Sequence, residues 1–264
     1  MKKIMLLVSL FCLAVPAAQA AVQGKEVNYQ ANGTTLKGYL AYDDAIKGKR
    51  PAVLVVHEWW GHNSYARKRA DMLAGLGYTA LAVDMYGDGK QANHPDEAGK
   101  FAAEVSKNMP LAKARFEAGM QLLRKQKTVD AKRIAAIGYC FGGGVVLNMA
   151  RIGANLKGVA SFHGSLGTDN PAQPGKVKAR IISFTGESDR MISADTVAAF
   201  KKEMESAGAD FKVVTYPGVK HSFTNPDADE LGRKFDLPLA YNAAADKDSW
   251  QQTTVFLREI FSRK

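Results

Sequence analysis

A Gly-x-Cys-x-Gly motif at residues 138–142 constrains this chain more than any other stretch of its sequence. The apolar residues 134–137 before it predict a short buried strand, and the glycine-rich residues 143–147 after it predict the start of a helix. Glycines on both sides permit a sharp strand-to-helix turn in which larger side chains would collide with the backbone. Such a turn is a nucleophile elbow, and its central residue here is Cys140. The helix N-terminus beside it favours a thiolate.

The first twenty residues have the pattern of a secretory signal peptide. Lys2 and Lys3 precede an apolar run over residues 4–15, and Ala-Gln-Ala at residues 18–20 is a small-x-small cleavage site. The apolar run is too short to remain as a membrane-spanning helix. We therefore expect cleavage after Ala20, a periplasmic or secreted bacterial protein, and no stable membrane insertion afterwards.

Cleavage of the signal peptide would change the cysteine content of the protein. It would remove Cys12 and leave Cys140 as the one cysteine of residues 21–264. A lone thiol in an oxidising compartment cannot form an internal disulfide, so Cys140 is either a reactive residue or a buried structural one.

Composition favours one α/β domain over residues 21–264 and limits the classes of partner. The net charge of the whole chain is +10, but the basic residues are dispersed. Their densest cluster, residues 124–127, lies at a predicted helix end, where cations suit the helix dipole. The sequence has no basic patch interleaved with aromatic residues. We expect no nucleic-acid partner, and we expect a monomer.

The order of predicted elements indicates a mostly parallel sheet. Two antiparallel strands at residues 26–31 and 35–42 flank Asn32-Gly33, a strong hairpin signal. Further elements alternate, which implies right-handed crossovers and helices on both faces. We leave residues 87–108 and 165–178 as irregular segments bordering a site. The further strands are predicted at 52–56, 79–83, 134–137, 158–162, 180–184 and 211–216, and the helices at 63–76, 110–126, 193–206 and 239–261.

Two residues downstream of Cys140 complete a candidate catalytic triad. A thiol nucleophile needs a base, and the base needs an orienting carboxylate. Asp189 and His221 each follow a predicted strand, so both lie at the same edge of the sheet as Cys140. Alone, Asp189 is as readily a helix cap and His221 a packed histidine. Together, in the order nucleophile, acid, histidine, they predict a triad on an α/β-hydrolase fold, with a mostly parallel central sheet and an N-terminal antiparallel hairpin.

Residues 57–62, His-Glu-Trp-Trp-Gly-His, invite a zinc interpretation that the spacing excludes. The two histidines are five residues apart and follow a strand, whereas HExxH ligands are four apart on a helix. We expect no metal and no cofactor. The loop instead suits one backbone N–H of an oxyanion hole, with the Phe141 N–H as the other. Glu58 in this apolar loop is expected to have a raised pKa and to exchange a proton with the thiol; the alternative is a solvated loop acid.

Over nearly all of residues 21–264 the chain resembles the dienelactone hydrolases, or carboxymethylenebutenolidases. The resemblance implies the Cys140, Asp189 and His221 triad and a Glu58 that contacts the cysteine in the resting enzyme. It also implies Trp59 and Phe141 as the oxyanion donors. Beside the cysteine elbow and His57-Glu58-Trp59-Trp60-Gly61, it rests on Gly38-Tyr39-Leu40-Ala41, Asp84-Met85-Tyr86 and Gly218-Val219-Lys220-His221-Ser222-Phe223. Aromatic candidates for the acyl pocket are Trp59, Trp60, Tyr86, Tyr139 and Phe223.

The chain departs from this family where a substrate carboxylate would bind. The family's type enzymes use two arginines, and the matching positions here hold Gly87 in one case and Thr224 and Asn225 in the other. Lys90 or Lys220 are candidate substitutes, but a flexible ammonium lacks the bidentate fork of arginine. We expect weakened recognition of carboxylated substrates.

The leading hypothesis is an exported, cofactor-independent hydrolase of small esters or lactones that works through a Cys140 thioester. A second hypothesis is a thiol-redox or electrophile-scavenging protein that uses the same activated thiol. The absence of a resolving cysteine from residues 21–264 counts against it. A third is a non-catalytic binding domain on the same fold.

Overall fold

The computed structural model describes residues 22–262, so the predicted signal peptide at residues 1–20 lies outside the described residues. The strands are β1 Val22–Ala31, β2 Thr34–Asp43, β3 Arg50–Val56, β4 Thr79–Val83, β5 Val129–Tyr139, β6 Gly158–Phe162, β7 Arg180–Gly186 and β8 Phe211–Tyr216. The helices are α1 Ser64–Gly75, α2 Pro95–Ser106, α3 Met109–Arg124, α4 Phe141–Arg151, α5 Ala194–Ser206, α6 Ala228–Phe235 and α7 Ala243–Ser262.

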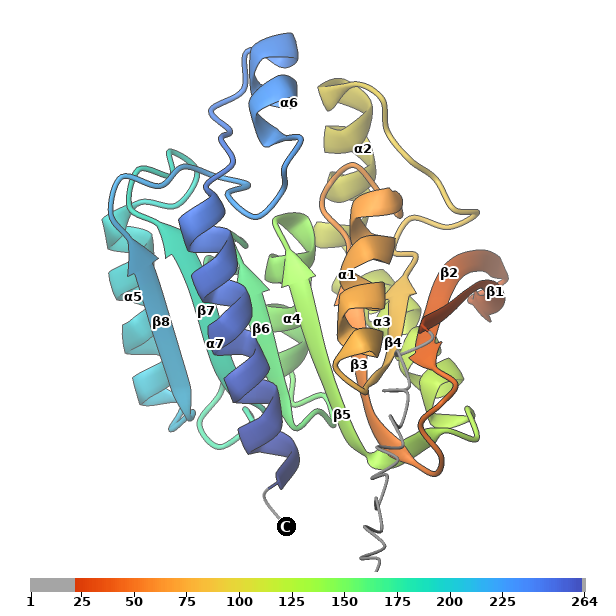
Figure 1. Ribbon diagram of the computed structural model, residues 1–264. Helices are drawn as coiled ribbons and strands as arrows, with labels where there is room; N and C mark the ends of the chain where they lie inside the picture. Colours follow the sequence, from red (N-terminus) through yellow and green to blue (C-terminus); the bar gives the residue numbers. More distant parts are fainter. Residues whose placement is uncertain (1–21, 263–264) are drawn as a thin grey trace, which may run out of the picture.

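The eight strands form one sheet in the order β1-β2-β4-β3-β5-β6-β7-β8 (Figure 1). β2 pairs antiparallel with β1 and β4, and the pairs from β4 to β8 are parallel. The hairpin between β1 and β2 turns at Asn32 and Gly33, whose φ angles of 49° and 80° suit a tight two-residue turn. The predicted α/β-hydrolase fold with its N-terminal hairpin is confirmed.

Helices cover both faces of the sheet, with α1 and α7 on one side and α3, α4 and α5 on the other (Figure 1). Alternate residues of β3 enter opposite layers of the core: Leu54 and Val56 face α3 and α4, and Val53 and Val55 face α1 and α7. Both sets must therefore be apolar, which is why this strand has a continuous apolar sequence. The parallel strands carry their loops to a common edge, where α2 and α6 also lie.

Two helices were not predicted from the sequence. Residues 87–108 are not irregular throughout, because Pro95 begins α2 and the His94 side chain caps it by accepting from the Asp96 amide. The C-terminal helix begins at Ala243 rather than Leu239, since Leu239 pairs with the loop after β8. The eight-residue α6 precedes that pairing.

The nucleophile elbow has the backbone geometry that its glycines predict. Cys140 lies between β5 and α4 with φ 51° and ψ −115°, a conformation that is strained for a residue with a side chain. A Cβ on Gly138 would lie 2.1 Å from the Gly142 carbonyl oxygen, and one on Gly142 would lie 2.3 Å from the Val56 oxygen. The turn closes only because these two positions have no side chain.

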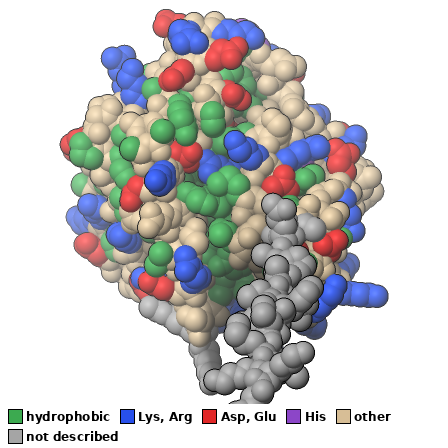
Figure 2. Space-filling view, in the orientation of Figure 1, with side chains coloured by type: hydrophobic (Ala, Val, Ile, Leu, Met, Phe, Trp, Pro, Cys, Tyr) green, Lys and Arg blue, Asp and Glu red, His purple; other side chains and the backbone are tan. Residues whose placement is uncertain are grey.

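The face drawn in Figure 2 shows no patch of a single charge sign. Lys, Arg, Asp and Glu side chains are interspersed over the face in Figure 2. Within residues 22–262, no helix has both the length and the apolar character needed to cross a bilayer.

We expect Gly142→Ala to destabilise the protein and Gly144→Ala, two residues further along α4, to stabilise it. The added methyl at 142 overlaps backbone oxygens, whereas at 144 its nearest neighbour is the Ser165 oxygen at an ordinary 3.5 Å. Urea unfolding should show a loss of about 1–3 kcal/mol for the first and a gain of about 0.5–1 kcal/mol for the second. Equal effects would contradict this account of the elbow.

Candidate active site

Three side chains from separate strand ends meet at the carboxyl edge of the sheet. Cys140 follows β5, Asp189 follows β7 and His221 follows β8. His221 Nε2 lies 3.1 Å from Cys140 Sγ, and His221 Nδ1 lies 2.7 Å from Asp189 Oδ2. Asp189 and His221 are buried, while Cys140 is partly exposed. A nucleophile, a base and an orienting carboxylate are thus within hydrogen-bond reach of one another.

The charges around His221 favour its protonated form. Burial alone lowers the pKa of His221, but the adjacent Cys140 sulfur and the Asp189 carboxylate outweigh burial and raise the pKa to about 10. The Met191 amide donates to the second oxygen of Asp189 at 2.8 Å, which fixes the carboxylate. These neighbours therefore stabilise an imidazolium beside the Cys140 sulfur.

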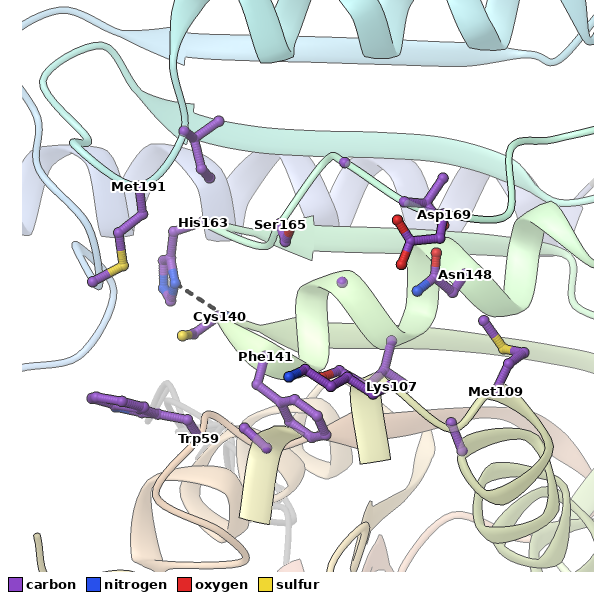
Figure 3. Close-up of a pocket in the computed structure, with 18 of the residues that line it drawn as sticks. Trp59, Lys107, Met109, Cys140, Phe141, Asn148, His163, Ser165, Asp169 and Met191 are labelled. Atoms are coloured by element: carbon purple, nitrogen blue, oxygen red, sulfur yellow. Dashed lines mark hydrogen bonds between the residues drawn. The ribbon is translucent and has the colours of Figure 1, made fainter. Parts of the chain in front are cut away.

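His163, which the sequence did not single out, holds the nucleophile from the other side. The Cys140 amide donates to His163 Nδ1 at 3.1 Å and to the Phe162 carbonyl at 2.9 Å (Figure 3). His163 Nδ1 is thus an acceptor, so its Nε2–H donates to Thr224 Oγ1 at 2.8 Å. Burial and the neighbouring His221 lower the pKa of His163 well below its usual value, which keeps the ring neutral. Its position after a buried strand, like those of Asp189 and His221, was the signal available.

Glu58 is buried and has its own partners. Its carboxylate accepts from Asn225 Nδ2 at 2.6 Å and from Ser222 Oγ at 3.3 Å. Burial raises the pKa of Glu58, as predicted, although its hydrogen bonds and the nearby His221 oppose the shift. It is therefore not a solvated loop acid. The contact between Glu58 and Cys140 that the resemblance implied is not formed here, because Cys140 faces His221 instead.

The two histidines of residues 57–62 serve the backbone. His57 Nδ1–H donates to the Glu58 carbonyl at 2.6 Å, and His57 Nε2 accepts from the Met85 amide at 3.2 Å. The His57 carbonyl accepts from the Gly142 amide at 3.1 Å, which ties this loop to α4. His62 bonds a carbonyl of β4. Within residues 22–262, no cluster of three or more His, Cys, Asp or Glu is arranged to hold a metal.

Two backbone amides are available beside the thiol. Phe141 is the first residue of α4, so its N–H has no acceptor within the helix. Trp59 lies in a turn closed by a bond from the Gly61 amide to the Glu58 carbonyl. In the described part of the chain, neither amide has a hydrogen-bond acceptor. Both residues line the cavity at Cys140.

The buried side chain of Arg69 holds the segment that follows His221 in place. Arg69 of α1 donates to the Thr224 carbonyl at 2.7 Å and to Tyr65 Oη at 3.2 Å, and it pairs with Asp246 of α7. Tyr65 Oη in turn lies 2.6 Å from Thr224 Oγ1, which bonds His163. These bonds satisfy polar groups that would be costly to bury alone, and they position the segment after His221.

Cys140 opens into a cavity of about 510 Å³, a volume typical of small-molecule sites. The cavity runs over α4 between the α2–α3 region and residues 163–170 (Figure 3). Residues 165–170, predicted to border the site, do so. Lining residues include Trp59, Ala102, Lys107, Met109, Ala112, Cys140, Phe141, Gly144, Val145, Asn148, Met149, His163, Asp169, Met191, Ile192 and His221.

Of the aromatic residues predicted for the acyl pocket, only Trp59 lines this cavity, and the other four predictions are wrong. Tyr139 shares with Ile137 the face of β5 that packs on α1 and α7, away from α4, and Phe223 lies in the same layer. Tyr86 is buried behind Phe141 with its hydroxyl on the Trp59 carbonyl. Trp60 lines a separate cavity beside α6.

The positions that match the family's carboxylate-binding arginines do not offer a cation to the cavity. A side chain at Gly87 would meet Thr34, and Asn225 is engaged with Glu58. Neither Lys90 nor Lys220 lines the cavity. The weak recognition of carboxylated substrates remains a prediction. It agrees with the finding that none of these positions places a cation in the cavity.

Comparison with known proteins identifies the chain's relatives. The model of the dienelactone hydrolase family matches residues 36–261. An Aquifex aeolicus protein named "Putative carboxymethylenebutenolidase" is 30% identical over 79% of this chain and 90% of its own. The crystal structure of a dienelactone hydrolase-like promiscuous phosphotriesterase from metagenomic libraries is 31% identical, covers 91% of this chain and 99% of that one, and has a TM-score of 0.83. The structure named m3DLH is 34% identical, covers 91% of this chain and 99% of that one, and has a TM-score of 0.86. The chain therefore belongs to the dienelactone hydrolase family and is a hydrolase of ester or lactone bonds.

Proposed function

We propose that this protein is an exported hydrolase of carboxylic esters or lactones that works through a thioester on Cys140. The observation that carries the proposal is the hydrogen-bonded series Cys140 Sγ, His221 and Asp189, open to a small-molecule cavity. The site is completed within one chain, which supports a monomer as the working form.

In the first half of the reaction, His221 takes the proton of Cys140 and the thiolate attacks the acyl carbon. The developing oxyanion lies between the Trp59 and Phe141 amides, where fixed donors typically contribute about 2.7–4 kcal/mol each. The His221 imidazolium, oriented by Asp189, then donates its proton to the leaving alcohol oxygen. The C–O bond breaks, the alcohol departs, and a thioester remains on Cys140.

In the second half, water replaces the alcohol. His221 takes a proton from water, and the hydroxide adds to the thioester carbon. The tetrahedral intermediate collapses and expels the Cys140 thiolate. The acid product leaves, and the thiolate accepts the proton that His221 had taken from water. Asp189 remains ionised throughout and stabilises the imidazolium.

Glu58 is proposed to regulate the proton content of the site rather than to attack substrate. Burial raises its pKa and so makes a protonated carboxyl easier to form than in water. With Glu58 bonded to Asn225 and Ser222, Cys140 is left to His221, which is the arrangement the reaction requires.

The geometry favours hydrolysis over the redox and binding hypotheses. A sulfenate-forming thiol would also profit from a base, but it does not need two free amides beside it. A binding domain has no need of a strained φ at Cys140.

We expect His221→Ala to slow alkylation of Cys140 by iodoacetamide at pH 7 by about tenfold or more, because the thiol loses the base that accepts its proton. Lys220→Ala is the matched control, since that side chain is exposed and outside the cavity. Labelling is followed by intact mass. Unchanged labelling of His221→Ala would favour an inert binding domain.

We expect Cys140→Ala to reduce hydrolysis of p-nitrophenyl acetate and butyrate by about 10³–10⁶-fold. Quenching the wild type during turnover should show a protein carrying one acetyl group, and Cys140→Ala should carry none. Equal turnover by the two proteins would contradict the thioester. Thiol-reversible oxidation by mild peroxide without ester turnover would favour the redox hypothesis.

We expect the full-length chain, expressed in a Gram-negative host, to be recovered from the periplasm with Ala21 as its first residue. The measurement is intact mass and N-terminal sequencing. Ala20→Phe should block cleavage, because the cleavage site requires a small residue there. Cytoplasmic recovery with an intact N-terminus would contradict export.

A further inference from the structure

The cavity beyond Cys140 is an elongated groove rather than a compact pocket. One face of α4 forms its floor through Phe141, Gly144, Val145 and Asn148. From the first to the last of these residues the helix makes about two turns, or about 11 Å. In Figure 3, Asn148 lies at the end of the groove away from Trp59. The site can therefore accept a chain extended along α4.

The fold determines which half of an ester lies in this groove. Asp189 and His221 reach Cys140 from the β7 and β8 side of β5. The groove wall formed by Met109 and Ala112 belongs to α3, which packs on β1, β4, β3 and β5. The leaving oxygen must lie beside His221 to receive its proton. The acyl half is left to extend toward α3.

The groove walls are largely apolar and carry one side chain of each charge sign. Val145, Met149, Met109, Ala112 and Ile192 supply apolar surface along the walls. Of the lining residues that the structure describes, only Lys107 and Asp169 belong to the Lys, Arg, Asp and Glu classes, and both are exposed. Figure 3 shows Asp169 with Asn148 and Met109 at the outer end, and Lys107 nearer to Phe141. No buried cation is available there to pair with a carboxylate.

We propose that the groove selects esters with an uncharged, extended acyl chain of medium length. In a zigzag chain each carbon–carbon bond of about 1.5 Å advances by about 1.3 Å, so roughly nine or ten carbons cover the length of the groove. Each methylene that leaves water for the apolar wall strengthens binding, whereas a terminal carboxylate loses hydration and meets only the exposed Lys107, whose charge is opposed by that of Asp169. This inference rests on the proposed ester hydrolysis and names the acyl group it accepts.

The test compares kcat/KM for p-nitrophenyl acetate, butyrate, octanoate and laurate with that for the p-nitrophenyl monoester of suberic acid. The last has the length of octanoate and ends in a carboxylate. We expect octanoate to exceed acetate by at least about tenfold, laurate to gain nothing further, and the suberate ester to fall at least about tenfold below octanoate.

Variants that fill the groove test whether the preference for octanoate over acetate arises there. Asn148→Phe should lower the octanoate-to-acetate ratio by about tenfold, because the ring occupies the outer groove. Ile152→Phe is the matched control, since the same ring is placed at an exposed position just after α4 and outside the groove, and the ratio should not change. Ala102→Phe on the opposite wall should repeat the effect if Asn148→Phe does not fold.

The outcomes separate the two proposals. Absence of Cys140-dependent turnover of every ester would overturn both the proposed hydrolysis and the groove. Turnover with a flat or falling chain-length profile, a preference for the suberate ester, or ratios unaffected by both groove variants would overturn the groove alone and leave ester hydrolysis in place.

Discussion

The site depends on one strained backbone position. Cys140 holds a positive φ that a side chain disfavours, and it keeps this conformation because its amide is shared between the Phe162 carbonyl and His163. The Gly142 amide bonds the His57 carbonyl, so three strand ends, those of β3, β5 and β6, hold the turn. Slippage of any one of these parallel pairs would move the sulfur away from His221. The register of these strands therefore fixes the position of the Cys140 sulfur relative to His221.

A second constraint is that only one of the two neighbouring buried histidines, His163 and His221, can carry a positive charge. His163 and His221 lie with ring centroids 5.2 Å apart, and two imidazolium ions at that distance would repel strongly. Desolvation and its hydrogen bond from the Cys140 amide keep His163 neutral. The sulfur and Asp189 place the charge on His221. One ring can thus carry the charge while the other holds the backbone, although the two are chemically identical.

Local patterns predicted most of the sheet and the meeting of Cys140, Asp189 and His221, because buried parallel strands are continuously apolar and their loops share one edge. The helices α2 and α6 were missed, since each buries only two residues and α6 is only eight residues long. Side-chain direction was also missed: Tyr139 precedes the nucleophile, but strand alternation sends it to the α1 and α7 layer. Arg69 and His163 act through partners distant in sequence, which no local pattern reveals.

Reaction and recognition are built from separate parts of this molecule. Thr224 and Asn225, at positions where the type enzymes of the family hold a carboxylate-binding arginine, are turned inward to Tyr65, His163 and Glu58. Their hydrogen bonds support the catalytic loop, so a substrate cannot use them without disturbing it. The proposed acyl groove over α4 shares no residue with that inward network except His163. Substitution along this groove can alter the substrate while the triad keeps its geometry.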